Sequence, residues 1–497
     1  MKIRSILGAL VIAALPFTPV WAENMTPEDI KKLVDEAVNK RMQELERREG
    51  ATERKESDAA SPATTDPGIG PLPEVGKDLR TEKQPPLSFS STGSGRLVYA
   101  KPFVTAPKAI VGGYFDIQYR SHTNSVIENG YPGGVTNGFD QQRFVPFIYA
   151  DITEHVKFAS ELEIEHGIRG AGENEISLEF AFIDYLIKEP VNLRAGIILI
   201  PIGKFNLLHD SPLNDLTDRP LVAQYVIPST LSETGGGFYG TFYPGRTGKL
   251  DYEFYYTTGP CGYNTDGSPR INETTGTKDS RQRKCENDDG LDINNGKAVS
   301  GRLAYSPMLG VEIGGSNYYG NSSPYSYNSL NITAIDWTLQ KGPFELIGEA
   351  AWAYARGNSR AIPIAPDGQN FGFAPGALLT GVNTLNPAAS APQRSQGYYI
   401  QGNYHFMPAI LTKLSPKRFG EGSTFTAVIR WDEVNLNQDN TGPSAGRQQQ
   451  ISFGLNYRPV EDTVFKISYQ YLPETFNVNS NQQIHDQALV ISAATYF

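Results

Sequence analysis

Sixteen short segments in which apolar and polar side chains alternate occupy the chain from about residue 111 to its end. In the segment 156–165, Phe158, Leu162 and Ile164 fall on one face of an extended strand, and Lys157 and three glutamates fall on the other. Soluble β-sandwiches and β-solenoids also alternate in this way, so the pattern predicts an all-β fold without choosing between architectures. We expect strands near residues 111–120, 143–152, 155–166, 176–187, 191–199, 236–243, 249–258, 298–305, 309–318, 328–340, 343–355, 397–406, 424–432, 450–458, 463–472 and 487–497.

The connections between these segments alternate between short and long, and this alternation distinguishes between the possible all-β folds. The short connections contain residues 153–154, 188–190, 244–248, 306–308, 341–342 and 459–462. The long connections include 121–142, 200–235, 259–297 and 356–396. One connection, 407–423, is long and apolar where a short turn is expected. Short turns at one end and long loops at the other are typical of bacterial outer-membrane barrels. The sequence therefore predicts an antiparallel transmembrane β-barrel of sixteen strands over residues 111–497.

Both ends of the chain agree with an exported barrel. Residues 1–22 combine Lys2 and Arg4, an apolar run and a small-residue site ending at Ala22, which is the pattern of a cleaved signal peptide. The last segment, 489–497, is an apolar strand that ends on Phe497. A closing strand of a barrel pairs with the first strand and has one face in lipid, so we expect Phe497 to face lipid and Tyr496 to face the lumen.

Residues 23–49 are expected to form a helix that lies outside the barrel. Thr26 and Pro27 are typical of a helix start, and apolar residues then recur at three-to-four spacing, which favours a periplasmic coiled coil over a loosely helical tail. Residues 50–110 are rich in Pro, Gly, Ser and charge and are predicted to be a flexible linker.

The charge of the chain excludes some partners. The formal net charge is −10 for the full sequence, and removal of Lys2 and Arg4 with the signal peptide would make it −12. A protein of this charge is not expected to bind nucleic acid. The mature chain also lacks an apolar run of the ~20 residues that a membrane-spanning helix needs.

Motifs for catalysis or cofactors find little support. Residues 235–240 match a glycine-rich nucleotide fingerprint, but a long loop precedes them and a strand follows, so a flexible loop end is favoured. The six histidines are scattered, and the acid-rich segment 286–296 does not have EF-hand spacing. We therefore expect no enzyme activity, no cofactor and no metal site.

Cys261 and Cys285 are the only cysteines, and both fall in the long connection 259–297. In an exported protein such a pair predicts a disulfide that closes the loop.

The polar faces of the strands predict the pore lining. With each apolar face in lipid, the lumen is expected to carry more acidic than basic side chains. These charges either pair into salt bridges of a polar, hydrated wall or bias which ions pass through the pore. The predicted pore-wall residues are Lys157, Glu161, Glu163, Glu165, Glu179, Arg194, Asp251 and Glu253.

The connection 200–235 is the predicted constriction. It interleaves charged residues with Leu207, Leu208, Leu213, Leu216, Leu221 and Val222, and exposed leucines would be costly in water. Folding against the inner wall would bury them, whereas an outward cap or a subunit contact is the alternative. The predicted constriction residues are Lys204, His209, Asp210, Asp215, Asp218 and Arg219.

Taken together, these features resemble the phosphate-selective porin O/P family of bacterial outer-membrane porins. The resemblance lies in the signal peptide, the helix and linker, the strand count, the segment 193–205 (Leu-Arg-Ala-Gly followed by Pro-Ile-Gly-Lys-Phe) and Phe497. It implies a homotrimer of barrels in the outer membrane, with the third long loop folded inward. Phosphate-selective members line their constriction with Arg and Lys, whereas the inferred wall here is acid-rich. The sequence thus favours passive diffusion of small hydrophilic solutes or ions without phosphate specificity; a non-conducting adhesin or receptor that uses its long loops is the alternative.

Overall fold

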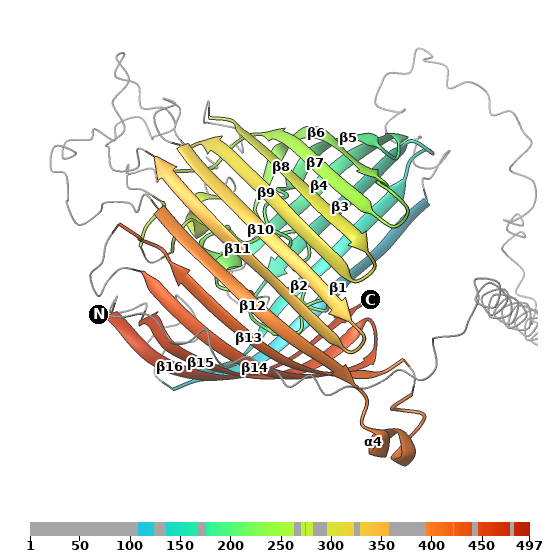
Figure 1. Ribbon diagram of the computed structural model, residues 1–497, viewed down its shortest axis with the longest axis vertical. Helices are drawn as coiled ribbons and strands as arrows, with labels where there is room; N and C mark the ends of the chain where they lie inside the picture. Colours follow the sequence, from blue (N-terminus) through green and yellow to red (C-terminus); the bar gives the residue numbers. More distant parts are fainter. Residues whose placement is uncertain are drawn as a thin grey trace, which may run out of the picture. The chain divides into compact units, whose positions relative to one another are not determined.

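The described part of the chain is a closed barrel of sixteen antiparallel strands, each paired with its two neighbours (Figure 1). The computed structural model describes residues 108–123, 136–166, 175–262, 270–273, 275–281, 296–322, 329–356, 394–420, 422–439, 446–477 and 482–497. The predicted signal peptide 1–22 and helix 23–49 lie outside these residues, as does the linker up to residue 107. The strands are β1 (Lys108–His122), β2 (Asn137–Asp151), β3 (Val156–Glu165), β4 (Glu175–Lys188), β5 (Val191–Leu199), β6 (Ser232–Phe242), β7 (Lys249–Thr257), β8 (Ala298–Met308), β9 (Val311–Asn321), β10 (Ser329–Lys341), β11 (Phe344–Arg356), β12 (Arg394–Phe406), β13 (Thr424–Asn435), β14 (Arg447–Val460), β15 (Thr463–Asn477) and β16 (Gln482–Tyr496).

The predicted all-β barrel and its strand count are confirmed, but several strand boundaries differ. The first strand begins at Lys108, three residues before the predicted start of the barrel, and β16 begins at Gln482. The glycine-rich segment 235–240 was predicted to be a flexible loop end, and this prediction is wrong, because the segment lies inside β6. A Cβ on Gly235 would lie 2.2 Å from the carbonyl oxygen of Tyr256, so this glycine permits close packing of β6 on β7.

Pairing of β1 with β16 closes the barrel. The two strands run antiparallel from Tyr114 opposite Tyr496 to His122 opposite Ala488. Phe497 extends the pairing, since its N–H donates to the carbonyl of Gly113 at 2.9 Å and its carbonyl accepts from the N–H of Gly113 at 3.1 Å. The Phe497 ring is 58% exposed and stacks on Phe144, whereas Tyr496 points inward and packs against Tyr114.

Side chains alternate between an apolar outer surface and a polar interior. In β13, Ile429 and Trp431 are 52% and 48% exposed, while the intervening Arg430 and the following Asp432 are buried. The same outward exposure of Ile, Leu, Phe, Trp and Tyr recurs on every strand pair, and a surface of this kind is suited to hydrocarbon rather than water. Within the described residues, no helix has the length and the apolar character needed to cross a bilayer.

The short connections gather at one end of the barrel. The turns β2–β3, β4–β5, β6–β7, β8–β9, β10–β11 and β14–β15 lie at the end where β1 begins and β16 stops. The predicted exception, 407–423, also lies at this end and contains the helix α4 (Ala409–Leu414), which projects away from the barrel with Ile410 and Leu414 largely exposed (Figure 1).

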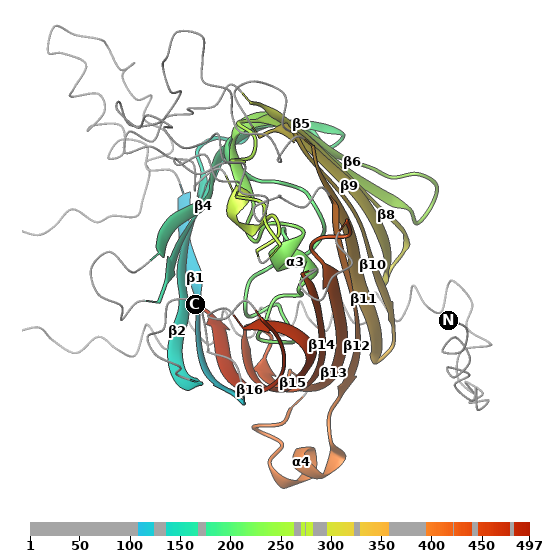
Figure 2. The ribbon, with the colours of Figure 1, turned by 90° about the vertical axis from the view of Figure 1, so that its left-hand side faces the viewer.

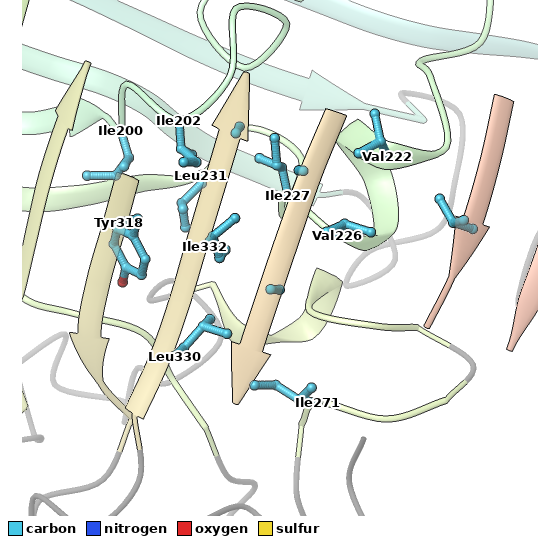
Figure 3. Close-up of a cluster of buried hydrophobic side chains, with 14 of the residues drawn as sticks. Ile200, Ile202, Val222, Val226, Ile227, Leu231, Ile271, Tyr318, Leu330 and Ile332 are labelled. Carbon is cyan, nitrogen blue, oxygen red and sulfur yellow. The ribbon is translucent and has the colours of Figure 1, made fainter. Parts of the chain in front are cut away.

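The main apolar cluster lies inside the barrel, between the connection that follows β5 and the inner faces of β8 to β13. Figure 3 shows Ile200, Ile202 and Leu231 beside Tyr318 and Ile332 of the wall. A polar-lined barrel of this size therefore obtains its core from a connection that enters the lumen.

We expect Gly113→Ala to destabilise closure of the barrel. A Cβ at this position would lie 2.4 Å from the carbonyl oxygen of Val145 and 2.7 Å from the Phe497 ring, so β1 must move against β2 or the last residue must be displaced. Overpacking of this kind costs about 1–3 kcal/mol. Urea unfolding of the refolded barrel measures the cost, and Gly315→Ala is the control, since a Cβ there meets nothing within 4 Å. Equal stabilities of the two variants would contradict the prediction.

Candidate functional site

Residues 200–231, which connect β5 to β6, form the inner loop, and this segment lies inside the barrel (Figure 2). The inner loop includes one short helix, α3 (Val222–Tyr225). It corresponds to the predicted constriction 200–235, shortened because β6 starts at Ser232. Its side chains and backbone contact inward-facing residues of strands on several sides of the lumen.

Apolar contacts attach both ends of the inner loop to one side of the wall. Ile200, Ile202, Val222, Val226 and Ile227 are fully buried in the cluster with β8 to β13. Small side chains on the facing strands leave room for these residues, and they are Ala298, Ala334, Ala351, Ala353 and Ala355. An inner wall of alanines was not expected from the sequence, because Ala fits either face of an alternating strand.

The leucines of the inner loop are only partly buried. Leu216 and Leu221 are buried, and Val222 is inaccessible. Leu208 and Leu213 remain 48% and 51% exposed, contrary to the expectation that all the leucines would be covered. These two residues lie in the middle of the loop, where polar contacts replace the apolar cluster.

A backbone turn at Gly203 fixes the start of the inner loop on the wall. Gly203 has φ +69° and donates its N–H to Oγ of Ser316 at 2.9 Å. Two residues further on, the N–H of Phe205 donates to Oε2 of the buried Glu349 at 3.1 Å. Lys204 extends to β9 and β10, where its Nζ lies 2.9 Å from Glu312 Oε1 and 2.8 Å from Thr338 Oγ1.

Asp215 and Asp218 attach the loop to the side of the wall formed by β1 and β12 to β15. Asp218 accepts from the guanidinium of Arg120 at 2.9 Å and from Gln470, and its backbone carbonyl accepts from Arg430 at 3.0 Å. Burial alone would raise the pKa of Asp218, but Arg120 and the other donors lower it to about 2, so Asp218 is ionised. Asp215 accepts from Asn403 at 2.8 Å and lies 3.5 Å from Arg458; burial raises the pKa of Asp215 despite that arginine.

His209 and Asp210 contact the wall near β3, β4 and β16. The Nε2 of His209 lies 2.8 Å from Glu179 Oε2, and its Nδ1 lies 2.9 Å from the carbonyl oxygen of Asn206. Asp210 accepts from the hydroxyl of Tyr496 at 2.8 Å. Burial raises the pKa of Asp210, although His209 and Tyr496 oppose this. Arg219 differs from the other predicted constriction residues, because its Nε and Nη2 are buried without a hydrogen-bond partner.

The predicted pore-wall residues lie on the inner face of their strands, but the structure does not bring them to one place. Lys157, Glu161, Glu163 and Glu165 belong to β3 and Glu179 to β4, close to His209. Arg194 lies on β5, and Asp251 and Glu253 lie on β7. Here Arg194 Nε donates to Asp184 at 2.8 Å, and Glu253 accepts from Tyr255 at 2.8 Å.

Most inward-facing basic side chains form ion pairs within the wall. Arg143 lies 3.1 Å from Glu163 and from Glu165, Arg302 pairs with Asp336, and Arg430 Nε lies 2.7 Å from Asp432. Sequence analysis missed Arg143, Asp184 and Asp336. The pairs Asp184–Arg194 and Arg143–Glu165 stand directly opposite each other on adjacent strands, so only the strand register could have found them.

Part of the loop 258–297 covers the inner loop. Ile271 belongs to the apolar cluster, and Thr277 donates its N–H to the carbonyl of Tyr225 at 2.8 Å. Cys261 is buried and disulfide-bonded. Cys285 and residues 286–295 of the acid-rich segment lie outside the described residues. The pairing of Cys261 with Cys285 therefore stays a prediction.

A closed barrel with an apolar outer belt, a polar interior and an inward-folded connection has the architecture of a transmembrane β-barrel. No family model matches the chain. An uncharacterized protein of Aquifex aeolicus (strain VF5) is 24% identical over 419 residues, which are 83% of this chain and 86% of that protein.

Several solved structures are similar to this chain. An anion-selective porin from Comamonas acidovorans shares 11% identity with a TM-score of 0.47, over 78% of this chain and 99% of that one. The outer membrane channel DcaP of Acinetobacter baumannii shares 10% identity with a TM-score of 0.44, over 78% and 97%. OmpF of Salmonella typhi, in complex with daunomycin, shares 13% identity with a TM-score of 0.44, over 79% and 98%.

We expect Gly203→Ala to loosen the start of the inner loop. A Cβ there would lie 2.6 Å from the carboxylate of Glu349, and the positive φ adds strain, so the turn must leave the wall. Hydrogen exchange of residues 200–206 is expected to accelerate. Gly245→Ala is the control, because Gly245 has a similar φ of +74° with nothing within 4 Å of its Cβ position. Equal exchange of the inner loop in both variants would show that the contact with Glu349 does not hold it.

Proposed function

We propose that this protein is an outer-membrane porin, a passive channel for small hydrophilic solutes or ions that the inner loop narrows. The observation that carries the proposal is the attachment of the inner loop to several sides of the lumen, from Ser316 and Glu349 to Arg120 and Lys466. A loop held in this way narrows the lumen, and solutes would pass through the part of the lumen that the loop does not fill. Transport through it needs neither a cofactor nor a source of energy.

The distribution of side chains supports a water-filled interior. Inward-facing residues of β5 to β7 include Arg194, Tyr239 and Glu253, whose polar groups form hydrogen bonds along the inner wall. Lipid is the fitting environment for the outer belt, and bacterial outer membranes are where barrels of this kind reside. We expect the segment before Lys108 to lie in the periplasm, on the side of the short turns.

Fixed charge in the lumen favours a weak preference for cations over phosphate selectivity. Among the described residues, Glu253 faces the lumen and forms no ion pair with a lysine or arginine, whereas most basic side chains of the inner wall are paired with an acid. Paired charges largely cancel, so an unpaired carboxylate such as that of Glu253 contributes most to the sign of the potential along the lumen.

The purified full-length protein is expected to form ohmic channels in a planar lipid bilayer. In a KCl gradient, the reversal potential should have the sign of modest cation preference. Absence of ion current from a correctly folded barrel would overturn the porin proposal and favour a non-conducting surface protein that uses its long loops. Strong anion selectivity would overturn the assignment of charge.

Glu253→Gln tests the contribution of a single carboxylate to selectivity. The amide can still accept from Tyr255, so the variant removes charge while it keeps the hydrogen bond. We expect the reversal potential to move toward zero, because one fixed negative charge leaves the lumen. Glu154→Gln removes the same charge from an exposed turn and should leave the reversal potential unchanged. An equal shift in both variants would point to bulk surface charge instead of the lumen.

We further propose assembly as a homotrimer, which the resemblance to trimeric porins implies. Native mass spectrometry in detergent measures the stoichiometry directly, and a monomer would contradict this part of the proposal while leaving conduction through a single barrel possible.

A further inference from the structure

Glu161, Glu179 and His209 bring one potential ligand atom each to the same buried position between the barrel wall and the inner loop. These atoms all lie within 4.8 Å of one another. The three residues come from β3, β4 and the inner loop, and they are 3%, 0% and 3% exposed.

The two glutamates are incompletely satisfied. Oε1 of Glu161 and Oε1 of Glu179 are both inaccessible to solvent and have no hydrogen-bond partner. Among the described residues, neither carboxylate pairs with a lysine or arginine, and the nearby Arg219 bonds to neither through its Nε or Nη2. Burial of two neighbouring carboxylates requires a positive species beside them, which can be a proton shared between them, a protonated His209 or a bound metal ion.

The hydrogen bond to the other nitrogen of His209 prepares its ring for coordination. Nδ1 lies 2.9 Å from the carbonyl oxygen of Asn206, an acceptor, so the proton of a neutral ring belongs on Nδ1. Nε2 then directs a lone pair at Glu179 Oε2, 2.8 Å away. Two acceptors at this distance repel each other unless a cation or a proton lies with them. A backbone carbonyl behind the ring is the usual outer partner of a metal-bound histidine.

A β-bulge aims Glu179 into the same place. In the pairing of β3 with β4, Glu161 stands opposite Phe180 and Leu162 opposite Leu178, so Glu179 is the extra residue. Glu179 and Phe180 are consequently both buried on the inner side, which regular alternation would not allow. Bulges are devices that redirect a side chain.

We propose that Glu161, Glu179 and His209 bind one divalent transition-metal ion of the Zn²⁺ class, which joins the inner loop to β3 and β4. One imidazole and two carboxylates are ligands that Zn²⁺ accepts at about 2.0–2.2 Å, with a water molecule in the fourth position. Ligand atoms around such an ion are about 3–3.5 Å apart, and the separations of 2.8 Å to less than 4.8 Å seen here bracket that spacing. This site is independent of whether the barrel conducts.

Isothermal titration with ZnCl₂ tests the proposal on the full-length protein, without a polyhistidine tag and after removal of metal with EDTA. We expect one Zn²⁺ per chain. Glu179→Gln and His209→Gln should each weaken binding by more than about 100-fold, since even the outer partners of metal ligands contribute about 10- to 100-fold. Glu161→Gln keeps the shape of the side chain and provides a third variant if either of the others fails to fold.

The control is a second buried histidine–carboxylate pair. His122 Nδ1 lies 2.7 Å from Asp486, and no third ligand is grouped with them among the described residues. His122→Gln should therefore leave Zn²⁺ affinity unchanged, and a loss equal to that of His209→Gln would overturn the assignment of the site.

Further outcomes decide between a metal ion and a shared proton. Absence of stoichiometric Zn²⁺ binding by the folded wild-type protein would overturn the proposal and leave a proton to balance the two glutamates. Binding of Ca²⁺ as tight as that of Zn²⁺ would overturn the class of ion. In crystals grown with Zn²⁺, an anomalous peak within bonding distance of His209 Nε2 is expected, and a peak only at other positions would contradict the site.

Discussion

Closure of the sheet between β1 and β16 fixes where every other side chain can go. Hydrocarbon offers no hydrogen-bond partners, so a sheet in lipid must pair all of its edges. The register from Tyr114–Tyr496 to His122–Ala488 accomplishes this, and the alternation of each strand then becomes a division between lipid and lumen. A slip of one residue in β13 would turn Arg430 and Asp432 into the bilayer and Ile429 and Trp431 into the interior.

The inner loop solves the problem that closure creates. A barrel of sixteen strands encloses more space than its own side chains fill, and its inner wall is mostly polar. Here the apolar cluster is placed on β8 to β13, where alanines make room for Ile200, Ile202 and Val226. The middle of the loop is then held by directional contacts on other strands, among them Asp218 with Arg120 and His209 with Glu179. Apolar contacts supply burial, and the polar contacts determine the path that the loop follows across the lumen.

The barrel could be predicted from the sequence because its information is local. Alternation, turn residues and loop lengths all lie within short segments, and each of the sixteen predicted segments overlaps one strand. The position of the inner loop followed from a related argument, since leucines such as Leu216 and Leu221 require cover. That Leu208 and Leu213 remain half exposed could not be predicted, because cover depends on which distant strand each leucine meets.

Contacts between residues on opposite sides of the barrel could not be predicted either, because they join residues that are far apart in the sequence. The pair of Arg120 and Asp218 joins residues 98 positions apart, and the bulge that turns Glu179 inward breaks the alternation on which the prediction relied. The glycines at 235–240 show the opposite error, in which a local pattern suggested a loop while close approach to Tyr256 on β7 required glycine in a strand.

Buried carboxylates in this lumen are compensated in two different ways, and two glutamates have neither. Arginine compensates Asp184, Asp336 and Asp432 within the wall. The backbone N–H of Phe205 donates to the carboxylate of Glu349, so Glu349 holds the backbone of the inner loop and not one of its side chains. Glu161 and Glu179 have neither arrangement, although they are as deeply buried as the others. Because burial makes an uncompensated charge costly, the metal ion proposed between Glu161, Glu179 and His209 would balance these carboxylates, and its position between the wall and the inner loop would link the two.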